Sequence, residues 1–228
     1  MRPVLCLLPS PLLGPACWRP AAGALADRGW PVAEVPSPGA APRTGADVLD
    51  TYLTAIPADR DVLLVPHSNA GLFVPALAAR RPAAGYVFVD AGLPRAGAAR
   101  TPMIPPGFSP MLAAKADGDG MLPPWTQWWD GEDLSGLFPD ASTRAAVEAE
   151  QRRLPLSYFG ESVPVPPGWP GRPGGYVAFG DGYESERTVA TALGWPVTTL
   201  AGEHLHMLVD PAQVADAITG LIAAISPR

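Results

Sequence analysis

The segment from Val62 to Ala78 constrains the fold more than any other part of the chain. Val62-Leu63-Leu64-Val65 is a run of four apolar residues, which predicts a short buried strand. The alanine-rich apolar run from Leu72 to Ala78 predicts a helix, and Ser68 lies in the tight turn between the two. A strand-to-helix turn of this kind lifts one side chain out of the backbone at the end of a sheet, the arrangement called a nucleophile elbow.

Strands and helices alternate along most of the remaining chain. The predicted strands are Val4–Leu8, Val32–Val35, Val62–Val65, Tyr86–Val89, Tyr176–Phe179 and Val197–Leu200. The predicted helices are Trp18–Arg28, a helix that follows Thr44 and runs to Ala55, the elbow helix to Arg81, Glu184–Leu193 and Pro211–Ile225. Asp47, three residues after Thr44, gives the second of these helices a capping-box arrangement at its start. Short apolar strands separated by helices indicate a parallel sheet that is covered on both faces. Right-handed crossovers then make this α/β fold doubly wound.

Residues 93–172 interrupt this alternation. The segment is rich in proline and glycine, and its one clear predicted helix runs from Ser142 to Arg153. It is inserted between two predicted strands, at the end of the sheet that carries Ser68. We therefore expect one α/β domain over residues 1–228, with residues 93–172 forming a lid.

Composition excludes several classes of partner. The chain has 228 residues, a formal net charge of −6 and 47% apolar residues, which suits one globular domain and disfavours nucleic acid or an anionic membrane as a partner. Two cysteines do not make a disulfide framework. The apolar run at the N-terminus is short for a signal peptide and is broken by Pro9 and Pro11, and no run is long enough to span a membrane. These features predict a cytoplasmic protein.

A serine hydroxyl needs a neighbouring base to act as a nucleophile. The chain has three histidines, His67, His204 and His206. His67 directly precedes Ser68, so its side chain should point to another side of the turn and have a structural role. His204 follows the predicted strand Val197–Leu200, and loops that follow parallel strands open on one edge of the sheet. His204 is therefore expected to meet Ser68.

The imidazole in turn needs a carboxylate that fixes its tautomer. Asp90 follows the strand Tyr86–Val89 at the same edge, and Asp181 follows the strand Tyr176–Phe179. Both are candidates, whereas Glu203 is too close in sequence to His204 to reach its ring easily. The order Ser68, Asp90, His204 matches the nucleophile–acid–base order of one known fold pattern.

The sequence resembles α/β-hydrolases over nearly its whole length. The segment Gly202–Pro211, with a proline seven residues after His204, is similar to the histidine loop of that superfamily and selects His204 over His206. The closest pattern is that of thioesterase-like hydrolases of natural-product biosynthesis, in which the acid ends the strand after the elbow helix, as Asp90 does. The more usual acid position is occupied here by Tyr183. The resemblance implies about six strands. The spacing of histidines and cysteines offers no zinc site and no glycine loop is suited to a phosphate, so we expect no metal and no cofactor.

Three positions depart from the family pattern. Pro66 and Ala70 replace the two glycines around Ser68. Pro11 stands where the family has a residue whose backbone N–H binds the oxyanion, and proline has no N–H. We expect the N–H groups of Asn69 and Leu12, or the Ser10 hydroxyl, to form the oxyanion hole.

Three functions follow from these residues. The first is a serine hydrolase or thioesterase acting on an apolar ester or thioester, possibly linked to a carrier or to CoA. The second is a cyclase, lyase or epimerase that uses Ser68 and His204 for acid–base chemistry, which the loss of the oxyanion N–H favours. The third is a binding protein without catalysis. Trp125, Trp128 and Trp129 are expected either to line a substrate pocket or to hold the lid against the body.

Overall fold

The computed structural model describes residues 2–37, 41–95 and 97–226. A parallel sheet of five strands, in the order β1-β2-β3-β6-β7, forms its centre. Its strands are β1 (Val4–Leu8), β2 (Val62–Ser68), β3 (Gly85–Ala91), β6 (Gly174–Phe179) and β7 (Val197–Leu200). Every residue of β1, β2, β3 and β6 is buried, as expected for parallel strands covered on both faces. Their carboxyl ends share one edge.

The prediction of about six strands was wrong by one. Val32 forms a single parallel bridge with Leu5, and the backbone contacts there are limited to two hydrogen bonds at Leu5. The segment lies between Pro31 and Pro36. Because neither proline can donate a ladder hydrogen bond, the pairing does not extend into a strand.

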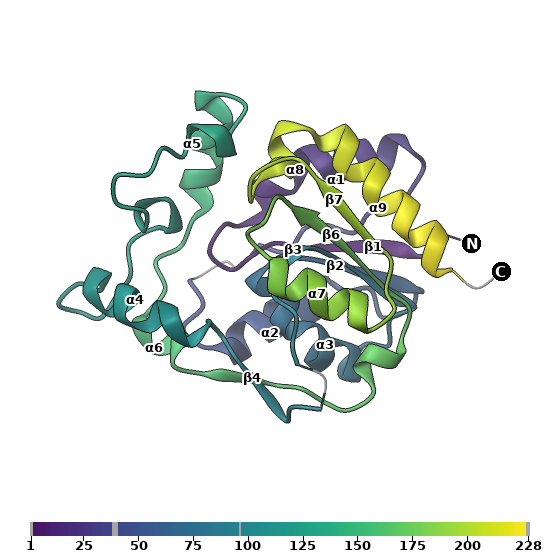
Figure 1. Ribbon diagram of the computed structural model, residues 1–228, viewed down its shortest axis with the longest axis horizontal. Coiled ribbons are helices and arrows are strands. Elements are labelled where there is room, and N and C mark those ends of the chain that lie inside the picture. The colour runs from purple at the N-terminus through teal and green to yellow at the C-terminus, as the bar shows by residue number, and fades with distance from the viewer. Residues whose placement is uncertain (1, 38–40, 96, 227–228) are drawn as a thin grey trace.

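Helices cover both faces of the sheet (Figure 1). The helices α1 (Arg19–Asp27) and α9 (Pro211–Ile225) pack together on one face. On the other face lie α2 (Gly45–Ala55) and α3 (Val74–Arg80), with α7 (Glu184–Ala192) against the later strands. Among the described residues, no helix is both long enough and apolar enough to cross a bilayer.

The 93–172 segment connects β3 to β6 and extends to one side of the sheet (Figure 1, teal to green). Its helices are α4 (Ser109–Lys115), α5 (Ala141–Glu150) and α6 (Leu156–Phe159). A short antiparallel pair joins β4 (Arg100–Pro102) to β5 (Ser162–Pro164). The helix predicted to reach Arg153 ends at Glu150, because Gln151 is already extended with φ −62° and ψ 135°.

Candidate active site

Ser68 ends β2 in a backbone conformation that few residues adopt. Its φ is 56° and its ψ is −130°, a region that costs a residue with a side chain about 1–3 kcal/mol. The chain turns directly from Ser68 into a 3₁₀ helix, η2 (Asn69–Phe73), and then into α3. The predicted strand, turn and helix are therefore present, with the strand continuing through Pro66. Ser68 is 8% exposed.

Gly71 lies where the elbow comes close to the residue that follows β3. A Cβ atom at Gly71 would lie 2.2 Å from the carbonyl oxygen of Gly92, a distance at which one of the two backbones would have to move. Ala70 is fully buried at the neighbouring position. The close approach between the elbow and the end of β3 therefore depends on Gly71, one residue after the position at which the expected elbow pattern has its second glycine.

Asp90 and His204 form the strongest polar contact of the site. The Nδ1 atom of His204 lies 2.6 Å from Oδ2 of Asp90. The other carboxylate oxygen, Oδ1, accepts a hydrogen bond of 2.9 Å from the backbone N–H of Phe179. Asp90 is 1% exposed, so both of its oxygens are fixed within the core. Because Nδ1 faces a carboxylate, it carries the proton and leaves Nε2 as the basic nitrogen.

The competing acid and base have other partners. The Asp181 side chain is 93% exposed and lies 3.8 Å from Arg187. His206 is buried, and its Nε2 lies 3.0 Å from the side-chain oxygen of Gln213. Glu203 is exposed. The structure thus brings Asp90 to His204 and leaves Asp181, His206 and Glu203 outside the contact.

His67 binds the backbone of the loop that carries His204. Its side chain is fully buried, and its Nε2 donates a hydrogen bond of 2.9 Å to the backbone oxygen of His204. The two imidazole rings lie with centroids 4.5 Å apart. Burial lowers the pKa of His67 well below its ordinary value, and the neighbouring His204 lowers it further. His67 is therefore a neutral ring that holds the backbone of His204.

Tyr183 packs against the imidazole of His204. Its ring stacks on that of His204, with centroids 5.5 Å apart and an angle of 20° between the planes. Burial raises the pKa of Tyr183, and the neighbouring Ser68 side chain offsets part of this effect. No direct hydrogen bond between Ser68 and His204 is recorded in the described residues. In the sequence, Tyr183 was noted only because it occupies the usual position of the acid.

The loop after β1 is a tight turn around Ser10. The N–H groups of Leu13 and Gly14 both donate to the carbonyl oxygen of Ser10, at 3.0 and 3.2 Å. The Leu12 N–H points back to the Ser10 hydroxyl at 3.4 Å. Of the expected oxyanion groups, the Leu12 N–H and the Ser10 hydroxyl thus face each other in this turn. The Asn69 N–H begins a helix, where it has no acceptor within the helix.

The three tryptophans have different surroundings. The Trp125 ring lies 5.7 Å from the His204 ring and 5.7 Å from the Trp129 ring. Trp128 packs against Phe159 within the 93–172 segment and donates its indole N–H to the backbone oxygen of Pro123. Trp125 therefore covers the candidate base, whereas Trp128 holds the segment together.

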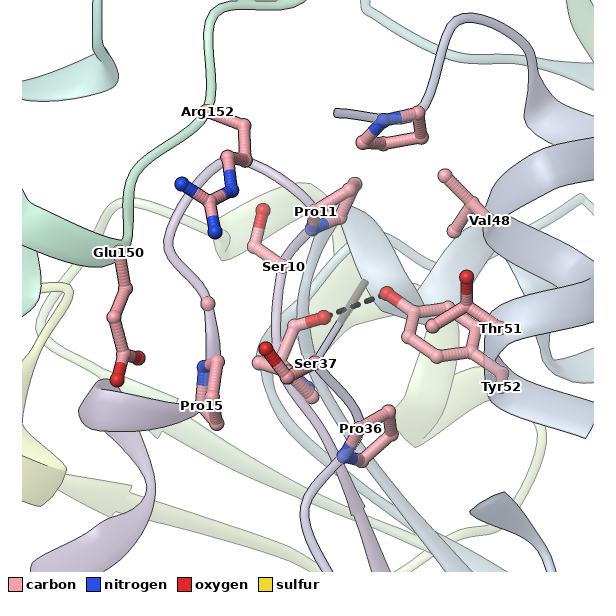
Figure 2. A pocket seen from close by; sticks show the side chains of 13 residues that line it. Ser10, Pro11, Pro15, Pro36, Ser37, Val48, Thr51, Tyr52, Glu150 and Arg152 are labelled. Atoms are coloured by element: carbon pink, nitrogen blue, oxygen red, sulfur yellow. Dashed lines mark hydrogen bonds between the residues drawn. The ribbon is translucent and has the colours of Figure 1, made fainter. Parts of the chain in front are cut away.

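A pocket opens beside the turn at Ser10 and Pro11 (Figure 2). Glu150 and Arg152 form one wall, Thr51 and Tyr52 of α2 form the other, and Ser10 and Pro11 lie between them. The Tyr52 hydroxyl donates to the backbone oxygen of Pro9 at 2.6 Å, which fixes the base of the turn. The enclosed volume is about 20 Å³, room for about one water molecule. Ser68, Asp90 and His204 do not line this pocket.

The sequence Asp117-Gly118-Asp119-Gly120, which has some likeness to a calcium loop, forms a turn of its own. Oδ1 of Asp117 accepts hydrogen bonds from the backbone N–H groups of Asp119 and Met121, at 3.0 and 2.9 Å. Its other oxygen pairs with Arg153. In the part of the chain that the structure describes, no group of three or more histidine, cysteine or acidic residues could hold a metal ion.

Comparisons with known proteins give a clear result for structure alone. No protein-family model matches the sequence, and no curated protein is significantly similar to it. Solved structures match over almost the whole chain. An extracellular α/β-hydrolase from a Paenibacillus species has a TM-score of 0.71 at 16% identity, covering 99% of each chain.

Two further structures are similar to the same extent. Polyneuridine aldehyde esterase has a TM-score of 0.69 at 16% identity, covering 97% of this chain and 100% of its own. The pyrethroid hydrolase PytH has a TM-score of 0.67 at 20% identity, covering 100% and 99%. Similarity at these identities shows the architecture, and the structural neighbours are α/β-hydrolases. The chain therefore has the α/β-hydrolase fold.

Proposed function

We propose that this protein is a serine hydrolase that acts on an apolar ester or thioester through Ser68, His204 and Asp90. The observation that carries the proposal is the 2.6 Å contact between His204 and Asp90, at the sheet edge where Ser68 ends β2 in its strained conformation. A buried carboxylate on Nδ1 leaves Nε2 free to accept the serine proton.

The proposed reaction has two steps. Ser68 Oγ attacks the carbonyl carbon while its proton passes to Nε2 of His204. The imidazolium, stabilised by Asp90, then gives that proton to the leaving alcohol or thiol, and water hydrolyses the acyl-enzyme by the reverse route. The Asn69 N–H would stabilise the oxyanion, helped by the Leu12 N–H or the Ser10 hydroxyl once the turn opens.

The surroundings of His204 favour an apolar acyl group. Trp125 and Tyr183 both pack against the imidazole, and Trp129 lies against Trp125. In this proposal the 93–172 segment acts as a lid that excludes water from the reacting carbonyl. The similarity to thioesterases in the sequence extends the candidates to acyl groups carried by CoA or by a carrier protein.

A second function is favoured by Pro11. Because this residue supplies no N–H, one oxyanion donor is missing, a loss worth about 2.7–4 kcal/mol in hydrolases. A cyclase, lyase or epimerase that moves protons between Ser68 and His204 has less need of that donor. One solved structure of similar fold carries a name that is not that of a hydrolase, a methylketone synthase from tomato, with a TM-score of 0.66 at 13% identity.

Covalent labelling distinguishes the two functions. The purified protein is treated with a fluorophosphonate and, separately, with p-nitrophenyl and thioester substrates, and its mass is then measured. We expect one fluorophosphonate adduct that maps to Ser68 and an acyl adduct in the burst phase, both absent from Ser68→Ala. His204→Ala should slow both reactions by about 10³-fold or more.

Each contrary result has a definite meaning. An unlabelled wild-type protein that turns over neither ester nor thioester contradicts the hydrolase. Labelling of Ser68 without any acyl adduct from either substrate contradicts the hydrolase but agrees with acid–base catalysis. Equal labelling of wild type and His204→Ala contradicts both functions.

A further inference from the structure

The side chain of Asn69 takes part in a closed cycle of hydrogen bonds. Its amide nitrogen donates to the backbone oxygen of Met103 at 2.7 Å, and its oxygen accepts from the Tyr158 hydroxyl at 2.9 Å. Within the 93–172 segment, the Met103 N–H donates to the backbone oxygen of Glu161 at 3.3 Å, and the Glu161 N–H donates to that of Tyr158 at 3.2 Å. The two groups that bind Asn69 are therefore linked to each other through Glu161.

This cycle is buried and attached to the body of the fold. Tyr158 and Met103 are both buried. Burial raises the pKa of Tyr158 well above its ordinary value, so its hydroxyl keeps its proton and remains a donor. One carboxylate oxygen of Glu161 accepts a hydrogen bond of 2.9 Å from the backbone N–H of Gly45, the first residue of α2. The partners of Asn69 are thus held by α2 as well as by their own segment.

The backbone that leads into Asn69 is fixed as well. The peptide between Ser68 and Asn69 has its carbonyl oxygen bound by the backbone N–H of Gly92 at 3.0 Å. Because the C=O and N–H of a trans peptide point in opposite directions, this contact turns the Asn69 N–H away from Gly92. In the described part of the chain, no backbone acceptor is recorded for that N–H. Its direction is therefore set by Gly92 on one side and by the Asn69 side chain on the other.

Pro11 makes the placement of this N–H more important. Proline supplies no N–H at the other expected donor position, and the Leu12 N–H points to the Ser10 hydroxyl at 3.4 Å. The Asn69 N–H is thus the expected donor that needs no change in the turn after β1. A donor stabilises the oxyanion only when it is held at hydrogen-bond distance from the position of that oxygen. Freedom of the Asn69 backbone would therefore slow the chemical step, whereas substrate binding would change little.

We propose that the side chain of Asn69 has a positioning role: by binding Met103 and Tyr158, it holds its own backbone N–H in the direction that stabilises the oxyanion. This proposal rests on the proposed function, since it concerns the oxyanion that forms when Ser68 attacks a carbonyl carbon. It gives the 93–172 segment a part in the reaction that is separate from the packing of Trp125 on the imidazole.

Two substitutions interrupt the cycle and keep the Asn69 N–H. Asn69→Leu replaces the amide by an apolar group of similar size, so both side-chain hydrogen bonds are lost. Tyr158→Phe removes one of them and leaves the elbow sequence intact. Tyr86→Phe is the matched control, because Tyr86 is a buried tyrosine of β3 whose hydroxyl has no partner recorded among the described residues.

Three measurements separate positioning from folding. The first is kcat and KM on a p-nitrophenyl ester. The second is inhibition by a boronic acid, which forms a tetrahedral adduct with the serine and places an oxygen where the oxyanion would lie. The third is the end point of fluorophosphonate labelling at Ser68, which counts the active sites. An unfolded fraction lowers this count and leaves kcat per labelled site unchanged.

We expect Tyr158→Phe to lower kcat per labelled site by about 3- to 10-fold, the usual worth of one hydrogen bond. Asn69→Leu should lower it by about 10- to 100-fold, which is less than the outright loss of an oxyanion donor. The affinity for the boronic acid should fall by about the same factor as kcat, while KM stays within about twofold of wild type. Tyr86→Phe should behave as wild type in all three measurements.

The proposal is overturned if either Asn69→Leu or Tyr158→Phe keeps kcat per labelled site within about twofold of wild type, or if the loss lies in KM alone. It is also overturned if the boronic acid binds Asn69→Leu as tightly as wild type, or if Tyr86→Phe loses as much activity as Tyr158→Phe. Failure of the underlying function is distinct, because in that case the wild-type protein itself is not labelled at Ser68.

Discussion

Two histidines in contact have opposite chemical surroundings. His204 presents Nδ1 to the carboxylate of Asp90, so protonation of its ring is balanced by a charge. His67 presents Nε2 to a backbone oxygen, and its Nδ1 is buried without a hydrogen-bond partner recorded in the described residues. Protonation of His67 would therefore place an unbalanced charge in the core.

This difference predicts how stability depends on pH. The folded-state pKa of His67 is lowered by burial, while the unfolded chain binds the proton near the ordinary value of about 6.5. The stability that the neutral His67 ring provides is thus fully present above pH 6.5, and it is lost as the pH falls below that value. Between pH 7.5 and 5.5 we expect it to reduce the free energy of unfolding by about 1.4 kcal/mol.

Urea unfolding of wild type and His67→Gln at both pH values checks this expectation. Glutamine can still donate to the His204 backbone oxygen but does not titrate, so the variant should lose the decline that His67 causes. His204 is present in both proteins and cancels in the comparison. Equal declines in the two proteins would show that His67 is already protonated, or solvated, in the folded state.

At the scale of elements, hydrogen bonds tie the 93–172 segment to the elbow. The Tyr158 hydroxyl donates to the side-chain oxygen of Asn69 at 2.9 Å. The Asn69 amide donates to the backbone oxygen of Met103 at 2.7 Å. The side-chain oxygen and nitrogen of Asn69 thus both bind the 93–172 segment, and Asn69 directly follows Ser68 in the chain. A shift of this segment would therefore displace the residue next to the nucleophile.

The tryptophans of the segment give a matched pair of substitutions. Trp125→Leu should lower kcat/KM by about 10-fold or more, because it uncovers His204, whereas Trp128→Leu should lower activity by less than about threefold. Both residues are buried, so both variants should lose about 1–3 kcal/mol of unfolding free energy. Urea unfolding measures the loss of stability. Activity is measured without urea, where both variants are folded. Equal losses of activity would contradict the assignment of Trp125 to the site.

The body of the fold could be predicted from the sequence better than the 93–172 segment. Three elements have the predicted bounds: Val4–Leu8, Val197–Leu200 and Pro211–Ile225. In each of them the apolar pattern ends where the flanking residues also favour an end. The capping box of Thr44 and Asp47 also forms as expected at the start of α2. The short helices α4 and α6 were missed, since one or two turns leave no clear period in a proline-rich segment.

At the scale of the whole molecule, the parallel sheet explains why the site was partly predictable. The carboxyl ends of β2 and β3 carry Ser68 and Asp90, and the loop after β7 carries His204. Strand ends follow from the sequence pattern, and parallel order brings them to one edge. The resemblance in the sequence favoured Asp90 over Asp181, whereas the contacts of His67 and Tyr183 depend on loop paths and rotamers that the pattern does not contain.

The most direct test of the central claim measures whether Ser68, His204 and Asp90 act as a unit. Ester hydrolysis is compared in Ser68→Ala, His204→Ala, Asp90→Asn and the double variant Ser68→Ala/His204→Ala, with folding checked by urea unfolding. We expect each single variant to lose about 10³-fold or more, and the double variant to be no slower than Ser68→Ala alone, because groups that act together are not additive. If the losses multiply in the double variant, or if Asp90→Asn retains the wild-type rate, the three side chains do not form one catalytic unit.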